Sequence, residues 1–406
     1  MLQEIDHSMP ATDVVPAKTS QPQDLPVAVS CSRFPGADGV EELQWMIRPT
    51  RYASFETQLE WVRLAYEKAV EDAGMTMNTA VWRRFLCSDL LNQTGILQSQ
   101  PFAVPDDQPN KCAVSWVCQP PVAPSKVTLW AQHVFDPSGS LQKTKSGKTL
   151  SLNRGELTHY WTTGVTTPDV EGAYDQTLGI FGQYDEVLSA HHLTLADNVV
   201  RTWFFAQNVD ANYAGLVEAR NEVFNECGLT PKTHYIASTG IEGGSSEVSA
   251  RTMMDAYAIR GVKPEQITHL HAQDYLSPTH IYGVAFERGT SIAYRDRKHI
   301  FISGTASIDS HGEILYPGDV FHQLDRTLIN IEALLNEAGA TMADMQVMLV
   351  YLRDPNDHAP ILVELNKRFP DTPFEVVTAP VCRPGWLIEI EGLAVVANDA
   401  PELPAF

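Results

Sequence analysis

The sequence is short of positive charge. Its 406 residues include 29 Lys and Arg against 50 Asp and Glu, which gives a formal net charge of −21 at pH 7. Nucleic-acid binding depends on clustered Lys and Arg that neutralise phosphates, so this imbalance argues against a nucleic-acid partner. It also means that an anionic ligand would need arginines placed locally in its own site.

Long hydrophobic runs and paired cysteines are missing as well. No stretch approaches the roughly 20 apolar residues of a membrane span, and the N-terminus lacks the basic region and apolar core of a secretory signal. We therefore expect a cytoplasmic protein without membrane contact. The six cysteines are scattered without a CxxC pair, which favours reduced thiols over a zinc site. His269, His271 and His280 lack a completing carboxylate or Cys, so we expect loop or surface histidines and no metal.

Apolar residues are present at regular spacing, most clearly in residues 299–396. Hydrophobic residues make up 44% of the chain, and its length suits two or three domains. The segment order is strand, helix, strand, helix, strand, strand. Asp319 can cap the first helix, and Gly339 can end it. Each helix has a single apolar stripe, which predicts an α+β unit with both helices on one face of a sheet.

The same layout recurs twice upstream. Residues 195–210 match residues 342–357 without a gap, and MTMNTAVWRRFLCSD parallels ATMADMQVMLVYLRD. Three diverged copies of one unit in a single chain are therefore predicted. The expected division is a disordered leader (1–26), unit 1 (27–140), unit 2 (141–262), a connecting segment (263–290), unit 3 (291–398) and a tail (399–406).

The last strand carries a pair of carboxylates. Side chains alternate across a strand, so Ile388 and Ile390 face one way while Glu389 and Glu391 face the other. The pair either faces solvent or lines a polar site. In the corresponding strands of units 1 and 2, Thr128 and Met253 replace Glu389. Solvated surface acids would have no reason to be confined to one copy, and this asymmetry favours a functional Glu389.

Several motifs resemble one enzyme family. SGTASI, PGDV, NIEALLNEAG, VYLR and CRPGWLIEIEG look like the C-terminal half of chorismatases, a branch of the RidA (YjgF) superfamily. Single-unit members of that superfamily assemble as trimers with ligand clefts between subunits. The resemblance thus implies three tandem RidA-like (chorismate-mutase-like) units that form a pseudo-trimer. Such a chain would act as a monomer, with a small anionic molecule bound in a cleft between units.

The resemblance also implies a reaction. In chorismatases the Glu at the position of Glu389 is the general acid, which protonates the enolpyruvyl methylene of chorismate. Water captures the resulting oxocarbenium-like species, and pyruvate leaves. A buried carboxyl with a raised pKa suits this role, because desolvation disfavours the charged form. No metal or organic cofactor is expected.

Chorismate carries two carboxylates, so its pocket should offer several cationic donors. Arg353 is one candidate, with an ion pair to Asp354 or Asp357 as the alternative. Arg220 would reach across the cleft between units, unless it is a solvated helix residue. Arg383 competes with a structural role in a turn. The other residues expected at the substrate are Tyr351, Tyr282, Ser303, Gly304, Thr305, Cys382 and Glu391.

Two other functions stay open from the sequence. A RidA-like imine deaminase needs an Arg on the penultimate strand, where this chain has Glu375 and its neighbours and no Arg. A catalytically silent ligand-binding or scaffold relative would keep the fold alone. The Tyr282-Gly283 pair matches chorismatases, whereas the VAFERGTSI that follows departs from their pattern. Cys382 is expected to be an inert thiol in the pocket wall, since the sequence offers no nearby His to activate it.

Overall fold

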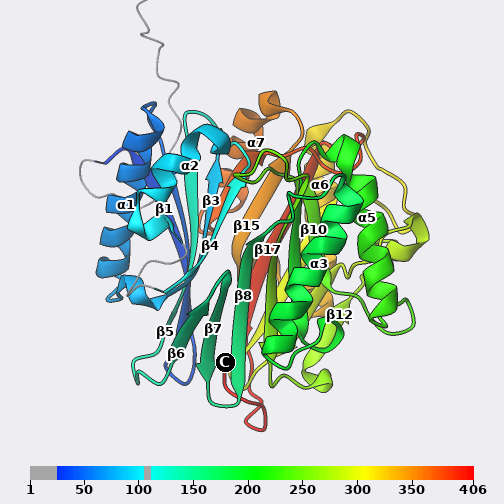
Figure 1. Ribbon diagram of the computed structural model, residues 1–406, viewed down its shortest axis with the longest axis horizontal. Helices are drawn as coiled ribbons and strands as arrows, with labels where there is room; N and C mark the ends of the chain where they lie inside the picture. The colour runs from blue at the N-terminus through cyan, green and yellow to red at the C-terminus, as the bar shows by residue number, and fades with distance from the viewer. Residues whose placement is uncertain (1–24, 105–110) are drawn as a thin grey trace, which may run out of the picture.

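The computed structural model describes residues 25–104 and 111–406, so the expected leader lies outside the described residues up to residue 24. Three mixed β-sheets follow one another along the chain, and each is accompanied by its own helices (Figure 1). This confirms the prediction of three tandem α+β units. No helix in the described part of the chain combines the length and apolar character that crossing a bilayer requires.

Unit 1 is a five-stranded sheet with the order β1-β2-β5-β3-β4. Its elements are β1 (Val27–Pro35), β2 (Glu41–Pro49), α1 (Phe55–Asp72), β3 (Ala80–Cys87), α2 (Leu90–Gln98), β4 (Ala113–Cys118) and β5 (Val127–Phe135). The apolar stripe of α1 packs against β2 and β5, as its spacing predicts.

Unit 2 is a six-stranded sheet with the order β10-β9-β11-β8-β7-β6. Its elements are β6 (Gln142–Ser146), β7 (Thr149–Arg154), β8 (Leu157–Val165), α3 (Ala173–Ala190), α4 (Leu195–Asn198), β9 (Val199–Ala206), α5 (Val209–Glu226), β10 (Ala237–Glu242) and β11 (Thr252–Arg260). The two long helices, α3 and α5, pack side by side.

Unit 3 is a six-stranded sheet with the order β12-β13-β14-β17-β15-β16. Its elements are β12 (Ile267–Leu270), β13 (Gly289–Ala293), β14 (Arg297–Ala306), α6 (Val320–Glu337), β15 (Met345–Leu352), α7 (His358–Arg368), β16 (Phe374–Thr378) and β17 (Ile388–Ala397). Asp319 caps α6 by accepting a hydrogen bond from the His322 N–H (3.1 Å). Strand β12 lies within the segment expected to connect units 2 and 3, so that segment contributes to the third sheet.

The strand registers make the three units directly comparable. The closing strand of each unit (β5, β11 or β17) pairs antiparallel with the strand after the first long helix (β3, β9 or β15). The equivalent facing pairs are Leu86 with Thr128, Phe205 with Met253, and Tyr351 with Glu389. Thr128 and Met253 therefore occupy the position of Glu389 in units 1 and 2, as the sequence alignment predicts.

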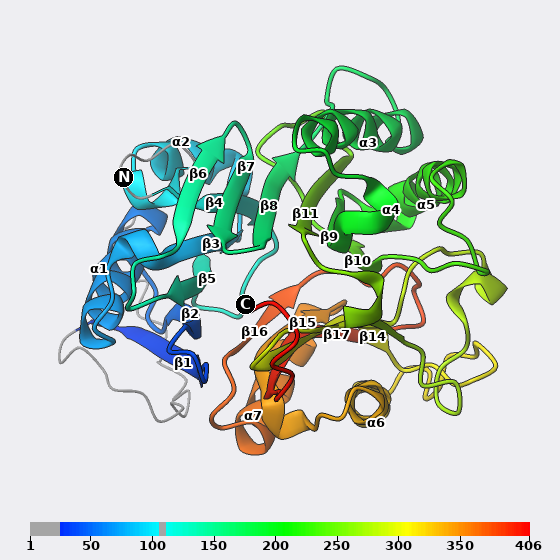
Figure 2. The same cartoon turned by 90° about the horizontal axis from the view of Figure 1, so that it is seen from below.

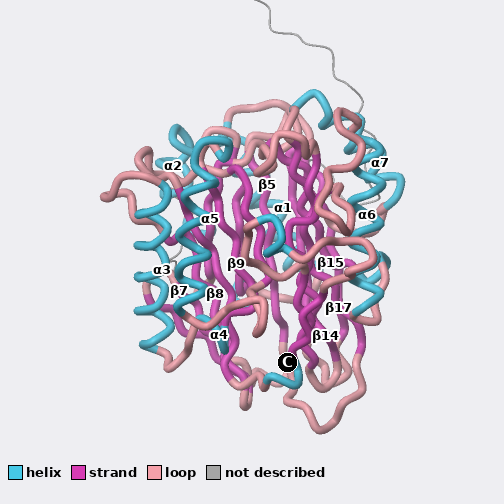
Figure 3. The backbone as a smooth tube through the Cα atoms, turned by 90° about the vertical axis from the view of Figure 1, so that its right-hand side faces the viewer, coloured by secondary structure: helices cyan, strands magenta, loops and turns pink. Residues whose placement is uncertain are grey.

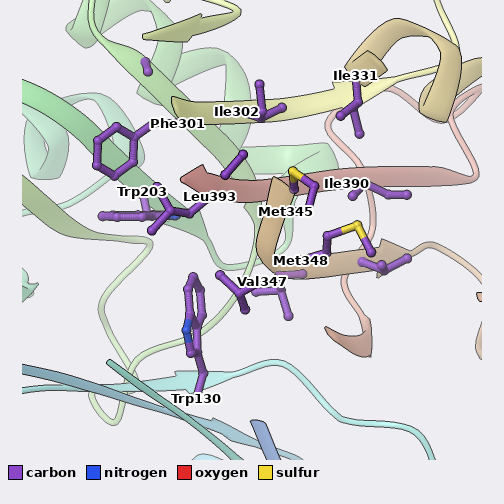
Figure 4. Packing of buried hydrophobic residues seen from close by; sticks show 14 of the residues in the cluster. Trp130, Trp203, Phe301, Ile302, Ile331, Met345, Val347, Met348, Ile390 and Leu393 are labelled. Atoms are coloured by element: carbon purple, nitrogen blue, oxygen red, sulfur yellow. The ribbon is translucent and has the colours of Figure 1, made fainter. Parts of the chain in front are cut away.

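The three sheets enclose a common interior, and the long helices lie outside them (Figure 2; Figure 3). Isolated β-bridges join neighbouring parts of the three units: Cys118–Gly244, Pro121–Val377, Ile241–Val381 and Ala237–Glu287. Figure 4 shows Trp130, Trp203 and Phe301, one residue from each unit, in the same buried region. The largest apolar cluster thus contains residues of all three units, so the units share one hydrophobic core.

Candidate functional site

A cavity of about 490 Å³ lies between units 2 and 3. Its walls come from α5, β10, the segment 282–288, β14, the loop 382–386 and β17. Among the described residues, the lining set is Tyr213, Ala214, Val217, Glu218, Arg220, Asn221, Ser238, Gly240, Tyr282, Gly283, Val284, Phe286, Arg288, Gly304, Ala306, Ile308, Cys382, Arg383, Trp386 and Glu389. This set contains no residue of unit 1.

Glu389 supplies the carboxyl group of the cavity. It lies on β17, on the face opposite the buried Ile388 and Ile390, and is 5% exposed. Its carboxyl makes no hydrogen bond to the part of the chain that the structure describes. Burial raises the pKa of Glu389 from 4.5 to about 8, and the negative charge of Glu391 adds to the rise. Glu389 therefore holds its proton at neutral pH.

Gly304 makes room for that carboxyl group. It lies on β14, and a Cβ built at this position would overlap Oε1 of Glu389. Thr239 on β10 is the next nearest neighbour, with its methyl group 3.1 Å from the same Cβ position. The backbone N–H of Gly304 donates to the Thr239 hydroxyl (2.9 Å), which ties units 2 and 3 together beside the cavity.

Three arginines give the cavity its positive charge. Arg220 is 1% exposed, and its Nε and Nη2 are buried without a hydrogen-bond partner. Arg288 donates from Nη2 to the Ser277 carbonyl (2.9 Å), while its Nε also lacks a partner. The guanidinium of Arg383 lies over the rings of Tyr282 (4.7 Å) and Trp386 (5.2 Å). Buried donors without partners are costly, and an anion bound in the cavity would satisfy them.

The remaining wall is largely uncharged. Tyr282 lies between two arginines, because Arg288 also approaches its ring (5.4 Å). The Gly283 carbonyl accepts a hydrogen bond from Asn221 of α5 (2.9 Å), which fastens this segment to unit 2. Burial raises the pKa of the Cys382 thiol to about 12, so Cys382 is a neutral part of the wall.

Glu391 lies outside this cavity, although it shares a strand face with Glu389. It accepts hydrogen bonds from Arg201 Nη2 (2.7 Å) and from the Trp203 indole (2.9 Å), and Arg84 Nη1 lies 3.9 Å away. It borders a separate interior cavity of about 30 Å³. Tyr351 is likewise buried outside the larger cavity. Both were expected at the substrate, and the packing of the three units directs them inward instead.

Arg353, Ser303 and Thr305 also lie outside the cavity lining. Arg353 pairs with Asp210, because the first turn of α5 packs beside the end of β15. The ion pair expected with Asp354 or Asp357 is replaced by this one with Asp210. The Ser303 hydroxyl donates to the Glu287 carbonyl (2.6 Å), and the Thr305 hydroxyl donates to the Ser303 carbonyl (2.9 Å). These two hydroxyls hold the backbone that positions Gly304.

The sequence reasoning missed the residues that unit 2 and the segment before β13 contribute. Arg288 is the main omission, and Ser238 and Gly240 of β10 are others. The sequence did offer one signal for Arg288, because Glu287 and Arg288 directly precede a buried strand. Both side chains are buried in the structure, and buried charged residues usually have a partner or bind a ligand. The β10 residues carry no such signal, because only tertiary packing brings them to unit 3.

His269 and His271, which were expected to be loop or surface histidines, lie outside the lining of the cavity. His269 stacks on His234 (4.7 Å between ring centroids), and His271 Nδ1 lies 3.5 Å from Glu287. Across residues 25–104 and 111–406, no group of three or more His, Cys, Asp or Glu is arranged to hold a metal ion.

Comparison with known proteins identifies relatives of both the last unit and the longer chain. The Endoribonuclease L-PSP family model matches residues 288–396. A RutC family protein from Pyrococcus abyssi is 35% identical over 97 residues, which is 23% of this chain and 76% of that protein. A 3-hydroxybenzoate synthase from Streptomyces hygroscopicus is 25% identical over 245 residues, covering 53% of this chain and 71% of that protein. A chorismatase crystal structure shares the fold, with 17% identity, a TM-score of 0.59, and coverage of 78% of this chain and 93% of that one.

Proposed function

The chain belongs to the RidA/YjgF (L-PSP) family, and from this premise we propose that it hydrolyses the enolpyruvyl ether of chorismate, or of a close relative, to release pyruvate. The observation that carries the proposal is a protonated Glu389 in a cavity whose buried arginines have unused donors. The similarity to a 3-hydroxybenzoate synthase and the fold shared with a chorismatase support the same substrate class.

The arginines fit a dicarboxylate substrate. Arg220 on α5 and Arg288 before β13 approach the cavity from different units, so each can take a separate carboxylate. Arg383 adds a third positive charge beside Tyr282. A chain with a net charge of −21 would otherwise repel such a ligand. The volume of about 490 Å³ is within the ordinary range for small-molecule sites.

Glu389 is the proton donor in this proposal. It transfers its proton to the methylene carbon of the enolpyruvyl group, which leaves an oxocarbenium-like cation at the ether carbon. Water adds to that carbon, the hemiketal collapses with cleavage of its bond to the ether oxygen, and pyruvate leaves. The ring oxygen takes up a proton and stays on the ring as a hydroxyl. An acid with a pKa of about 8 is protonated at neutral pH and ready to donate.

The alternatives fit the site less well. Imine deamination needs an Arg on the penultimate strand. In this chain that strand, β16, carries Glu375, which is bonded to Thr128 and Arg48. A silent scaffold would have no need for buried arginine donors without partners around an unbonded carboxyl. The negative net charge argues against an RNA substrate, although the family is called Endoribonuclease L-PSP.

We also propose that one chain forms the complete site. Both walls of the cavity come from units of the same chain, and β-bridges join each unit to the next. The species that sediments as a monomer should therefore release pyruvate from chorismate. Activity confined to a higher assembly would contradict this.

The function is tested by incubating the protein with chorismate and coupling pyruvate to NADH oxidation by lactate dehydrogenase. Chromatography of the second product then separates a cyclohexadienol acid from 3-hydroxybenzoate. We expect stoichiometric pyruvate and one ring product. If no pyruvate appears above the uncatalysed background, the proposed function is wrong.

A further inference from the structure

Glu391 is a buried carboxylate with a full set of partners. Arg201 donates to its Oε2 (2.7 Å) and the Trp203 indole to its Oε1 (2.9 Å), while Arg84 lies 3.9 Å from Oε1. Glu391, Arg201 and Arg84 are each at most 1% exposed. Charge-assisted donors at this distance favour the ionised form of a carboxyl group. Glu391 is therefore a fixed negative charge in the interior.

Glu389 lies two residues away on the same face of β17 and has the opposite environment. In the described structure its carboxyl has neither a hydrogen bond nor an ion pair. Two residues along a strand correspond to about 7 Å. Across that distance, in an interior that screens charge poorly, an ionised Glu391 disfavours a second negative charge. The proton shared by this pair of carboxyl groups should therefore reside on Glu389.

Burial is the largest cause of the raised pKa of Glu389 and the charge of Glu391 adds to it, whereas the other groups around Glu389 do not raise its pKa. Arg201 on β9 and Arg288 before β13 favour the ionised form of Glu389. Arg220 on α5 and Arg383 in the loop before β17 line the same cavity. Burial keeps Tyr213, Tyr282, Tyr351 and Cys382 neutral by raising their pKa values. Glu218 is exposed at the edge of the cavity. Glu391 is the buried anion that opposes the arginines.

We propose that Glu391 is a positioning residue for the reaction proposed above, whose buried charge keeps the transferable proton on Glu389 without touching the substrate. The inference rests on that proposed function for its kinetic test. It assigns to Glu391 a role distinct from the substrate contact that its sequence position suggests. Together with burial, it accounts for a carboxyl group that stays protonated although Arg288 and Arg201 act against this.

The same network gives unit 1 a part in the site. Arg84 of unit 1 bonds Asp255 of unit 2 (2.7 Å) and lies beside Glu391 of unit 3. Asp255 and Glu391 hold equivalent positions, because they pair with Trp203 and Leu349 in the same register. Arg84 thus balances two inward-facing carboxylates of the other units. Although unit 1 lines none of the cavity, it helps to keep Glu391 ionised.

The test is the pH dependence of kcat/KM for pyruvate release from chorismate. In the wild type, kcat/KM should fall at alkaline pH as Glu389 loses its proton, and this fall is the basic limb of the profile. In Glu391→Gln the basic limb should lie about one pH unit lower. At pH values above it, the variant should be about tenfold less active than the wild type. Glu391→Asp keeps the charge and should return the limb to its wild-type position. Asp255→Asn, a buried carboxylate of the same network on another strand, is the matched control and should not move the limb. A limb that stays in place in Glu391→Gln would overturn the proposal.

A second measurement needs neither folding of the Glu391 variant nor turnover. Infrared titration of the wild type should show a buried protonated carboxyl band that disappears as the pH rises through about 8. The band should be absent in Glu389→Gln. If it persists in that variant, Glu391 holds the proton and the proposal is wrong. Because this result does not depend on chorismate, it remains decisive if the proposed function itself fails.

Discussion

Two boundaries between units bury a glutamate and a threonine against each other, but with the residues exchanged. Between units 2 and 3, Glu389 is on the closing strand β17 and Thr239 is on the edge strand β10. Between units 3 and 1, Thr128 is on the closing strand β5, and its hydroxyl donates to Glu375 on the edge strand β16 (2.8 Å). The edge-strand positions are equivalent, since Thr239 pairs with Trp203 and Glu375 with Leu349.

The two carboxyl groups differ in what surrounds them. Glu375 is fully buried and accepts from the Thr128 hydroxyl, from Arg48 (3.3 Å) and from the Val376 N–H (3.0 Å). Glu389 borders a cavity and accepts from none of the described residues. A buried glutamate therefore makes bonds across one boundary, while at the other it has no bonding partner among the described residues. Both boundaries contain a buried glutamate, so the candidate site is distinguished by the missing hydrogen bonds of Glu389.

The largest expected difference between the two boundaries is the effect of replacing each glutamate on turnover. Glu389→Gln keeps the size of the side chain but cannot deliver a proton, so turnover of chorismate should fall about 10²–10⁴-fold. Glu375→Gln, the matched change at the other boundary, should leave the rate near wild type. Both rates follow from the coupled pyruvate assay. Equal losses in the two variants would mean that the boundaries do not differ in function.

The pH dependence of stability should separate the same two variants. The folded-state pKa of Glu389 is raised from 4.5 to about 8, so the native protein binds more protons than the unfolded chain between these values. Its contribution to stability is complete below pH 4.5 and is lost as the pH rises through 8, by about 1.4 kcal/mol for each unit of pKa difference. Glu389→Gln should therefore lose less stability than the wild type between pH 5 and 8 in urea unfolding. A variant with the wild-type slope would contradict the raised pKa.

Arginine substitutions test the charge on each side of the comparison. Arg220→Met removes a cation proposed to bind a substrate carboxylate, and KM for chorismate should rise about 10–100-fold. The free energy of unfolding should not fall, because the buried Nε and Nη2 of Arg220 have no partner to lose. Arg48→Met, at the other boundary, is the control and should leave KM unchanged, as should Arg353→Met. An unchanged KM in Arg220→Met would remove this residue from the site.

The smallest effect is expected on the stability of the structural boundary. Glu375→Gln weakens the contacts to Arg48 and Thr128, so the free energy of unfolding should fall by about 1–2 kcal/mol. A double-mutant cycle with Arg48→Met should show that the two changes are not additive. Additive losses would mean that the buried pair contributes no coupling energy.

The repeat and the position of Glu389 were predictable because their signals are local. Residues 195–210 and 342–357 form the same kinds of element, α4 and β9 against a short helical turn and β15. The match without a gap is wrong by one residue in the strands, because α4 is one residue longer than the turn and Val199 therefore corresponds to Met345. Alternation in the last strand was enough to place Glu389 and Glu391 on one face and the isoleucines on the other. Comparison of the copies then singled out Glu389, since Thr128 and Met253 stand at its position.

The partners of these residues were not predictable, because they come from other units. Arg201 and Arg84 meet Glu391 only when three sheets close around one interior. Arg353 was assigned to the substrate since nothing in its own segment reveals Asp210 in the first turn of α5. Strand periodicity indicates which face a side chain is on, but not which neighbouring unit covers that face.

The residue at the position of Gly304 can be used to classify relatives, because it determines whether the Glu389 carboxyl group has room. A methyl group added at this position would force the Glu389 carboxyl oxygen to move, and a single nucleotide change from a glycine to an alanine codon adds that methyl group. Descendants that keep glycine here and glutamate on the closing strand should retain turnover. Relatives with another residue in place of the glycine should hold the glutamate in a different orientation, and the activity proposed above should be lower in them.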